Sequence, residues 1–203
     1  MTYRYPDAGI QIFARAPVPG EAKTRLIPAL GADGAAALQA RLLQRTLAMA
    51  TRSALAPVQL WCSPDCDHAA FRDWPGVSRH VQQGADLGER MQHALIAGLE
   101  TAQRVILIGT DCPGLDAGYL RQAIERLAEH DVVLGPAEDG GYVLVGWRRP
   151  VDLFAAIDWG SERVLEQTRT RLRAAGVSWH ELPVLWDVDR PADVARLARY
   201  QNS

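Results

Sequence analysis

Apolar residues in this chain follow two alternating patterns. Short unbroken apolar runs, such as residues 105–108, are typical of strands covered on both faces of a parallel sheet. Longer stretches between them keep one apolar face at helical spacing, as Leu38, Leu42 and Leu47 do within residues 33–52. The pattern predicts strands at residues 10–14, 58–62, 78–82, 105–108, 132–134, 142–147 and 178–182. It predicts helices at residues 33–52, 67–74, 86–99, 117–128, 161–174 and 192–200.

This alternation of strands and helices predicts an α/β fold. The expected architecture is a three-layer α/β/α sandwich around a mostly parallel sheet, formed by residues 1–203 as a single domain. In such sheets ligands bind beyond the carboxyl ends of the strands. Functional residues are therefore expected directly after the predicted strands.

Composition excludes several classes of protein. With 48% apolar and 23% charged residues, the 203-residue chain has the composition of a folded globular protein. A net charge of −2 gives no support for nucleic-acid binding, and no apolar run reaches the roughly 18 residues needed to span a bilayer. Residues 1–7 show no signal pattern, and Cys62, Cys66 and Cys112 lack the spacing of a zinc site or disulfide framework. A cytoplasmic location is expected.

The distribution of basic residues draws attention to one loop. The chain has 22 lysine and arginine residues, and Lys23 is the only lysine among them. An ammonium and a guanidinium are not interchangeable where a phosphate meets a point charge. Lys23 lies with Arg15, Gly20 and Arg25 in the loop after the first predicted strand, which predicts phosphate binding. The spacing fits neither a P-loop nor a dinucleotide fingerprint, and the alternative is a solvated basic turn.

Three aspartates are candidate metal ligands. Asp111 follows the apolar strand 105–108, where a carboxylate beside nucleotide phosphates could hold Mg²⁺ or Mn²⁺. Its alternative role is to cap the following turn. Asp187 and Asp189 alternate along an expected strand end, so only one of them should face the crevice and supply a second metal carboxylate. Asp189 could instead lie near the N-cap of the last helix.

A Glu-Asp-Gly-Gly-Tyr segment follows the strand at residues 132–134. Glu138 and Asp139 are expected at the end of a strand running beside that of Asp111, where they could bind acceptor hydroxyls or act as a general base. The alternative is a plain hairpin turn, which the two following glycines permit. The acceptor-binding candidates are Gly140, Gly141, Tyr142 and Trp159.

Two helix starts carry weaker signals. Asp86 and Glu89 form a capping-box pattern at the start of a helix, and Gly88 and Arg90 could also line a nucleotide pocket. Ser161 is the expected cap of the helix at residues 161–174. The five histidines show no metal-ligand spacing.

Taken together, these motifs resemble a known family. The matching strings are F-A-R-A-P-V-P-G-E-A-K-T-R-L, L-G-E-R-M, G-T-D-C-P, G-P-A-E-D-G-G-Y, D-W-G-S and D-V-D-R-P-A-D. They resemble the bacterial selenodomain-associated transferase 1 family, over residues 10–197. The resemblance implies a glycosyltransferase-A fold of the nucleotide-diphosphosugar transferase type, with Lys23 and Arg25 on phosphates and Asp111 on the metal. The K-T-R-L segment is also similar to 2-phospholactate guanylyltransferases, and D-V-D-x-P-x-D to molybdenum-cofactor nucleotidyltransferases.

The sequence therefore predicts an enzyme, a metal-dependent transferase with a nucleotide-activated donor. The leading expectation is transfer from a nucleotide sugar to a small-molecule acceptor, with Asp111, Asp139 and Glu138 as catalytic residues and Mg²⁺ or Mn²⁺ as cofactor. The first alternative is a nucleotidyltransferase that joins a nucleoside triphosphate to a phosphorylated acceptor and releases pyrophosphate. The second is a nucleotide-binding module without turnover.

Overall fold

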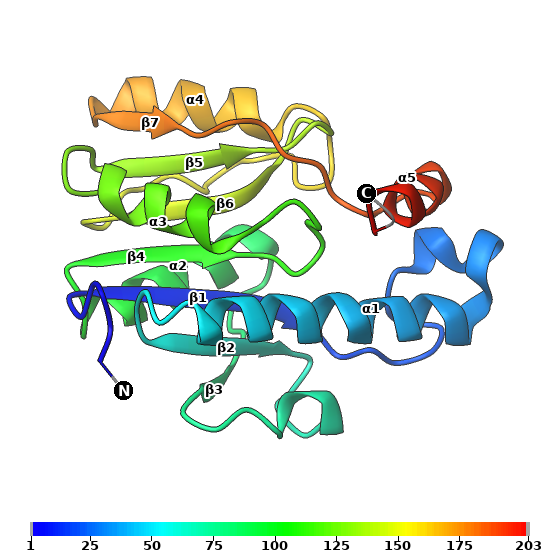
Figure 1. Cartoon of the computed structure of the whole chain (residues 1–203). Helices are drawn as coiled ribbons and strands as arrows, with labels where there is room; N and C mark the ends of the chain where they lie inside the picture. Colours follow the sequence, from blue (N-terminus) through cyan, green and yellow to red (C-terminus); the bar gives the residue numbers. More distant parts are fainter. Residues whose placement is uncertain (1, 202–203) are drawn as a thin grey trace.

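A seven-stranded sheet forms the centre of the molecule in the computed structural model, which describes residues 2–201 (Figure 1). The strand order is β3-β2-β1-β4-β6-β5-β7. All neighbouring strands are parallel except β6, which is antiparallel to both β4 and β5. The strands are β1 (Ala8–Arg15), β2 (Val58–Ser63), β3 (Ser78–Val81), β4 (Arg104–Ile108), β5 (Val132–Pro136), β6 (Tyr142–Trp147) and β7 (Trp179–Glu181). The expected mostly parallel sheet is confirmed.

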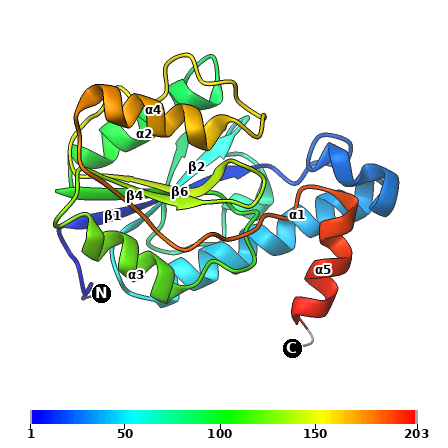
Figure 2. The same ribbon diagram turned by 90° about the horizontal axis from the view of Figure 1, so that it is seen from above.

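Helices cover both faces of this sheet (Figure 2). On one face Leu43 of α1 (Ile27–Arg52) and Leu120 of α3 (Ala117–Arg126) pack in one hydrophobic cluster with Ile106. On the other face α2 (Leu87–Leu99) and α4 (Val164–Ala175) pack in a second cluster with Val105 and Leu107. Consecutive residues of β4 thus enter opposite clusters, as the two-residue period of a strand requires. The three-layer α/β/α arrangement is confirmed.

A third, smaller hydrophobic cluster lies beyond the carboxyl ends of the central strands. There the first half of α1 packs against the segment that leads into α5 (Pro191–Gln201), and Figure 1 shows the two helices side by side. The members include Leu26, Leu38, Trp186, Val188 and Leu197. This cluster fixes the C-terminal segment close to the loop that follows β1.

The largest differences from the expected helix boundaries lie at three places. The helix α1 starts at Ile27, six residues early, because a break at Gly31 (φ 69°) joins two helical pieces. The expected helix at residues 67–74 is only the 3₁₀ turn η2 (Ala69–Phe71), whose single buried anchor is Phe71. The expected cap at Ser161 is wrong: its hydroxyl accepts a hydrogen bond from Arg163 N in a preceding turn, and α4 begins at Val164. A further 3₁₀ turn, η1 (Thr24–Leu26), precedes α1.

One buried carboxylate, that of Asp131, connects the ends of three strands at one edge of the sheet. Asp131, which is 7% exposed, precedes β5 and accepts hydrogen bonds from the backbone N and hydroxyl of Ser178, ahead of β7. It also accepts them from Arg148 and Arg149, which follow β6. These donors, the Arg149 guanidinium first among them, hold the pKa of the Asp131 carboxyl far below its usual range.

We predict that Asp131→Asn destabilises the protein in a pH-dependent way. At pH 7 the thermal midpoint should fall by roughly 3–10 °C, since charge-assisted hydrogen bonds are lost. A carboxyl with a depressed folded pKa stabilises fully above its unfolded pKa of about 3.9 and loses that contribution as the pH falls. The difference in thermal midpoint between wild type and variant should therefore become smaller below about pH 4.5. A gap that stays constant down to pH 2.5 would contradict the assignment, and Asp73→Asn at an exposed position is the control.

Candidate active site

The Lys23 side chain joins three distant segments beyond the carboxyl ends of the strands. Its ammonium lies 3.0 Å from Asp111 Oδ1 and donates a hydrogen bond of 2.7 Å to the carbonyl of Val188. The side chain is only 4% exposed, and the Lys23 backbone adopts the left-handed conformation (φ 47°). Val188 N in turn donates to the Asp111 carbonyl at 2.9 Å. The loop after β1, the end of β4 and the segment before α5 therefore meet at one point.

A buried glutamine contacts two of the segments that meet at the Lys23–Asp111 ion pair. Gln39 of α1, 4% exposed, donates through its amide to Thr110 Oγ1 at 3.2 Å and to the Arg15 carbonyl at 3.4 Å. The Thr110 hydroxyl lies 3.3 Å from Asp111 Oδ1. Gln39 was not among the predicted site residues, although a polar residue on the apolar face of a helix is a visible signal in the sequence.

A cavity of about 480 Å³, called cavity A, opens beside this point. It lies at the carboxyl ends of β1, β2 and β4, and Ser63, Gln82 and Leu87 complete its wall. Its charged lining residues are Arg15, Glu21, Lys23, Arg25, Arg90, Asp111 and Asp189. Four of the six candidate phosphate-binding residues thus surround one cavity. Gly20 lies in the same loop at φ 83° but does not line the cavity.

A second cavity of about 570 Å³, called cavity B, adjoins the first. It is lined by candidate catalytic and acceptor residues, among them Glu138, Asp139 and Gly140. Arg25 and Asp189 line both cavities, and the Arg25 guanidinium contacts Asp189 Oδ2 at 2.5 Å. This ion pair forms the boundary between cavities A and B.

Asp187 and Asp189 both line cavity B, so the expectation that only one faces the crevice is wrong. Residues 186–189 do not form a strand, and the alternation of side chains that a strand would impose is absent. Asp189 is engaged by Arg25, whereas Asp187 is the more buried carboxylate. Burial, followed by the negative charges of Asp111 and Asp139, raises the pKa of Asp187 to about 7, against the opposing effect of Lys23.

Glu138 and Asp139 follow β5, but β5 does not run beside β4 as expected. Strand β6 lies between them, because the chain returns antiparallel after the Gly140 turn. Glu138 is held by two bonds from the Arg196 guanidinium, at 2.5 and 2.8 Å, which lower the pKa of its carboxyl. Asp139 Oδ1 accepts a bond of 2.9 Å from Gly141 N. Arg196, on α5, had no signal in the sequence.

Gly140 fixes the wall of cavity B. Its backbone has φ 87°, and a Cβ at this position would lie within 2.8 Å of three backbone atoms of Glu162. Its carbonyl accepts a hydrogen bond of 2.8 Å from Leu165 N at the start of α4. The turn after β5 is therefore packed directly against the turn before α4.

Gly88, Tyr142 and Trp159 lie in packing contacts and line neither cavity A nor cavity B. A Cβ on Gly88 would come within 2.8 Å of the Trp159 ring, so this glycine permits close packing of α2. Tyr142 packs edge-on against Trp159, with ring centroids 6.5 Å apart. The expected helix start at Asp86 is confirmed: its side chain accepts a bond from Glu89 N.

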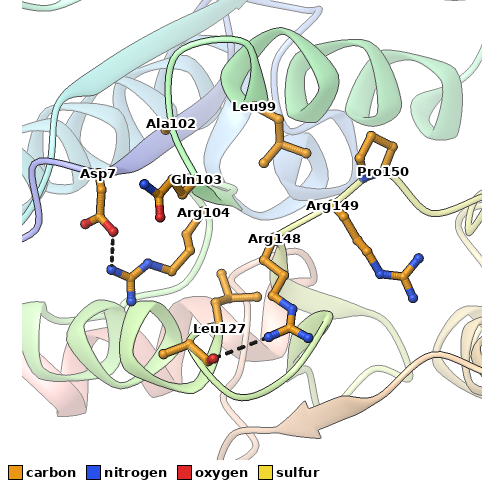
Figure 3. A pocket seen from close by; sticks show the side chains of 10 residues that line it. Asp7, Leu99, Ala102, Gln103, Arg104, Leu127, Arg148, Arg149 and Pro150 are labelled. Carbon is orange, nitrogen blue, oxygen red and sulfur yellow. Dashed lines mark hydrogen bonds and ion pairs between the residues drawn. The ribbon is translucent and has the colours of Figure 1, made fainter.

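A larger cavity of about 730 Å³, cavity C, lies at the opposite ends of the strands (Figure 3). Arg104, Arg148 and Arg149 line it, and each is already paired with an acid: Arg104 with Asp7, the others with Asp131. It contains none of the candidate site residues. Cavity C is therefore larger than cavities A and B but lies at the end of the sheet opposite the candidate site residues.

The Asp111 and Asp187 carboxylates lie close enough together for the negative charge of Asp111 to raise the pKa of Asp187. Within residues 2–201, no three His, Cys, Asp or Glu side chains are grouped so as to hold a metal ion by themselves. A cation at this point would need oxygen ligands from a bound substrate or from water, which is usual for Mg²⁺ beside phosphates.

Residues 46–161 match the model of a family described as an uncharacterized protein conserved in bacteria, DUF2064. The chain belongs to this family. A search of the curated proteins gave no match. No helix within residues 2–201 combines the length and apolar character needed to cross a bilayer.

Solved structures resemble this family member over nearly its whole length. A candidate nucleotide-diphospho-sugar transferase from Desulfovibrio desulfuricans G20 is 34% identical, with a TM-score of 0.85 over 94% of this chain and 86% of the other. A nucleotidyl transferase from Methanothermobacter thermautotrophicus is 13% identical, with a TM-score of 0.62 over 95% and 96%. Rv0371c from Mycobacterium tuberculosis, in complex with manganese, is 18% identical, with a TM-score of 0.53 over 95% and 97%. The expected fold of nucleotide-diphosphosugar transferases is confirmed.

We predict that Gly140→Ala destabilises the protein more than Gly160→Ala. Both glycines have positive φ values, 87° and 85°, so both substitutions carry the same conformational cost. Only at Gly140 does the added Cβ overlap with backbone, while Gly160 has nothing within 4 Å. Denaturant unfolding should show a further loss of about 1–3 kcal/mol for Gly140→Ala. Equal losses would mean that the Gly140–Glu162 contact does not constrain the turn.

Proposed function

We propose that the protein is a transferase that moves a glycosyl group from a nucleotide sugar to a small-molecule acceptor, assisted by Mg²⁺ or Mn²⁺. The observation that carries this proposal is that cavity A, which contains the Lys23–Asp111 ion pair, adjoins cavity B at the Arg25–Asp189 pair. A donor in cavity A would direct its reactive bond toward an acceptor in cavity B. The similarity to a candidate nucleotide-diphospho-sugar transferase at 34% identity supports the donor class.

Cavity A suits a nucleoside diphosphate. Arg15 and Arg90 have no ion-pair partner among residues 2–201, whereas Lys23 and Arg25 are balanced by Asp111 and Asp189. Two guanidiniums without an ion-pair partner give bidentate donors for the oxygens of a diphosphate. Lys23 adds a fixed positive charge that would stabilise the leaving diphosphate as its negative charge grows.

The residues around Asp111 fit a divalent cation. Asp187 is partly buried near Asp111, and the repulsion between the two carboxylates contributes to the raised pKa of Asp187, which a bound cation would offset. Asp111 and Asp187 would hold the cation, with Asp189 as the further carboxylate at the boundary of the cavities. When bound, the cation would supply positive charge to the donor phosphates. The manganese complex of the Mycobacterium tuberculosis structure supports this choice of metal.

The acceptor would react in cavity B. Its hydroxyl or amine attacks the anomeric carbon of the sugar, the bond from that carbon to the phosphate oxygen breaks, and the nucleoside diphosphate leaves. Asp139 is the better candidate for the proton from the nucleophile, because Glu138 is held by Arg196 in a bidentate pair that stabilises its ionised form. Glu138 would then act as a positioning residue for Arg196.

Nucleotidyl transfer is the second candidate function. Four cationic side chains line cavity A, which would also suit a nucleoside triphosphate, and the fold is similar to that of a nucleotidyl transferase. In that reaction the acceptor attacks the α-phosphate and pyrophosphate leaves.

We predict a metal-dependent rise in thermal midpoint with one class of nucleotide. A ligand at about 100 times its dissociation constant adds roughly 2.7 kcal/mol, or about 5–10 °C for a protein of this size. The measurement uses a panel of nucleoside triphosphates and nucleotide sugars, each with and without Mn²⁺. Asp111→Asn should lose the shift, and Asp73→Asn, exposed and outside both cavities, should keep it. No shift with any nucleotide would refute the proposed site.

The products distinguish the candidate reactions. The nucleotide that raises the thermal midpoint is incubated with a panel of acceptors. We predict release of nucleoside diphosphate, detected by chromatography and by ³¹P nuclear magnetic resonance. Release of pyrophosphate from a triphosphate would overturn glycosyl transfer in favour of nucleotidyl transfer. Binding with no turnover on any acceptor would indicate a nucleotide-binding module.

A further inference from the structure

Cavities A and B share a wall but differ in charge. In cavity B two ion pairs cancel, Arg25 with Asp189 and Arg196 with Glu138. One cation, Arg190, then remains against four acidic side chains, which leaves a formal charge of −3 with Asp187 ionised and −2 with Asp187 protonated. The four carboxylates are Asp139, Glu162, Asp187 and Asp193.

Cavity A has the opposite sign. Four cations face three acids there, a formal charge of +1. A divalent cation on Asp111 and Asp187 would add two positive charges at the junction, and the total for cavity B would still be negative. The difference in charge between the cavities therefore does not depend on the metal.

The hydrogen bonds that two of these carboxylates accept do not require a negative charge. Asp139 accepts a hydrogen bond from Gly141 N, and Asp193 accepts two, from Asp189 N and Arg190 N. An asparagine oxygen could accept the same bonds without a charge. Glu162 has no ion-pair partner among residues 2–201 and is exposed in the wall of the cavity. Such negative charges favour cations and repel anions that approach the same cavity.

We propose that cavity B selects an acceptor that is uncharged or cationic, with hydroxyl or amino groups, and excludes phosphate esters and other anions. This inference rests on the proposed function and narrows it. It makes Asp139 and Glu162 residues that determine specificity. It also separates the two candidate reactions, since nucleotidyl transfer to a phosphorylated acceptor would bring a dianion into the more negative cavity.

The charge of each cavity can be measured with matched cysteine probes. Ser161 lines cavity B and Ser63 lines cavity A, so Ser161→Cys and Ser63→Cys place nearly isosteric thiols in the two cavities. Both are made in a Cys66→Ser background, because Cys66 is partly exposed while Cys62 and Cys112 are buried. Each thiol is reacted with a cationic trimethylammonium-ethyl and an anionic sulfonatoethyl methanethiosulfonate. The rate of each reagent with a small thiol in solution corrects for the difference in intrinsic reactivity between the two reagents.

The ratio of cationic to anionic rate should be about tenfold higher at position 161 than at position 63. Adding Glu162→Gln and Asp139→Asn should lower the ratio at position 161 several-fold and leave it unchanged at position 63. Equal ratios, or a preference for the anionic reagent at position 161, would overturn the proposal. If Ser63→Cys does not fold, Thr24→Cys probes cavity A instead. Because no nucleotide is present, failure of the nucleotide-dependent thermal shift would refute the proposed function without altering this ratio.

Discussion

The ion pair between Lys23 and Asp111 is the contact on which the site depends. It joins a loop near the start of the chain to the end of the central strand β4, and through the Val188 carbonyl it holds the C-terminal segment against both. An ammonium that is almost completely buried needs such partners, since a buried unpaired charge is strongly destabilising. The ammonium thus orders the local backbone and places a fixed positive charge in the wall of cavity A.

Packing keeps these segments in place. Two hydrophobic clusters hold the sheet between its helices, while a third, containing Leu38 and Trp186, fixes the start of α1 to the segment before α5. The site lies between the sheet and this third cluster. Residues of the site can therefore adopt a left-handed backbone, as Lys23 and Gly140 do, because apolar contacts on either side determine their position.

Local patterns predicted the parts of the fold that depend on neighbouring residues. The apolar run of β4 was enough to place Asp111 at a strand end, and the Asp86 cap needed only its own helix. Contacts between distant segments were not predictable in this way. Arg196 pairs with Glu138 across 58 positions, and β6 inserts antiparallel between β4 and β5. The contact of Trp159 with Gly88 also joins distant segments, so a residue expected in a pocket packs against the hydrophobic core instead.

The Arg25–Asp189 pair that lies between the cavities would link the binding of the proposed donor to that of the proposed acceptor. A donor phosphate that attracts the Arg25 guanidinium leaves the Asp189 carboxylate without its counter-charge, and cavity B becomes more negative. A cationic acceptor would then bind more tightly to the donor complex than to the free protein. Coupling of this kind is reciprocal, so the acceptor would strengthen donor binding by the same factor. One shared ion pair would thus favour the ternary complex over either binary one.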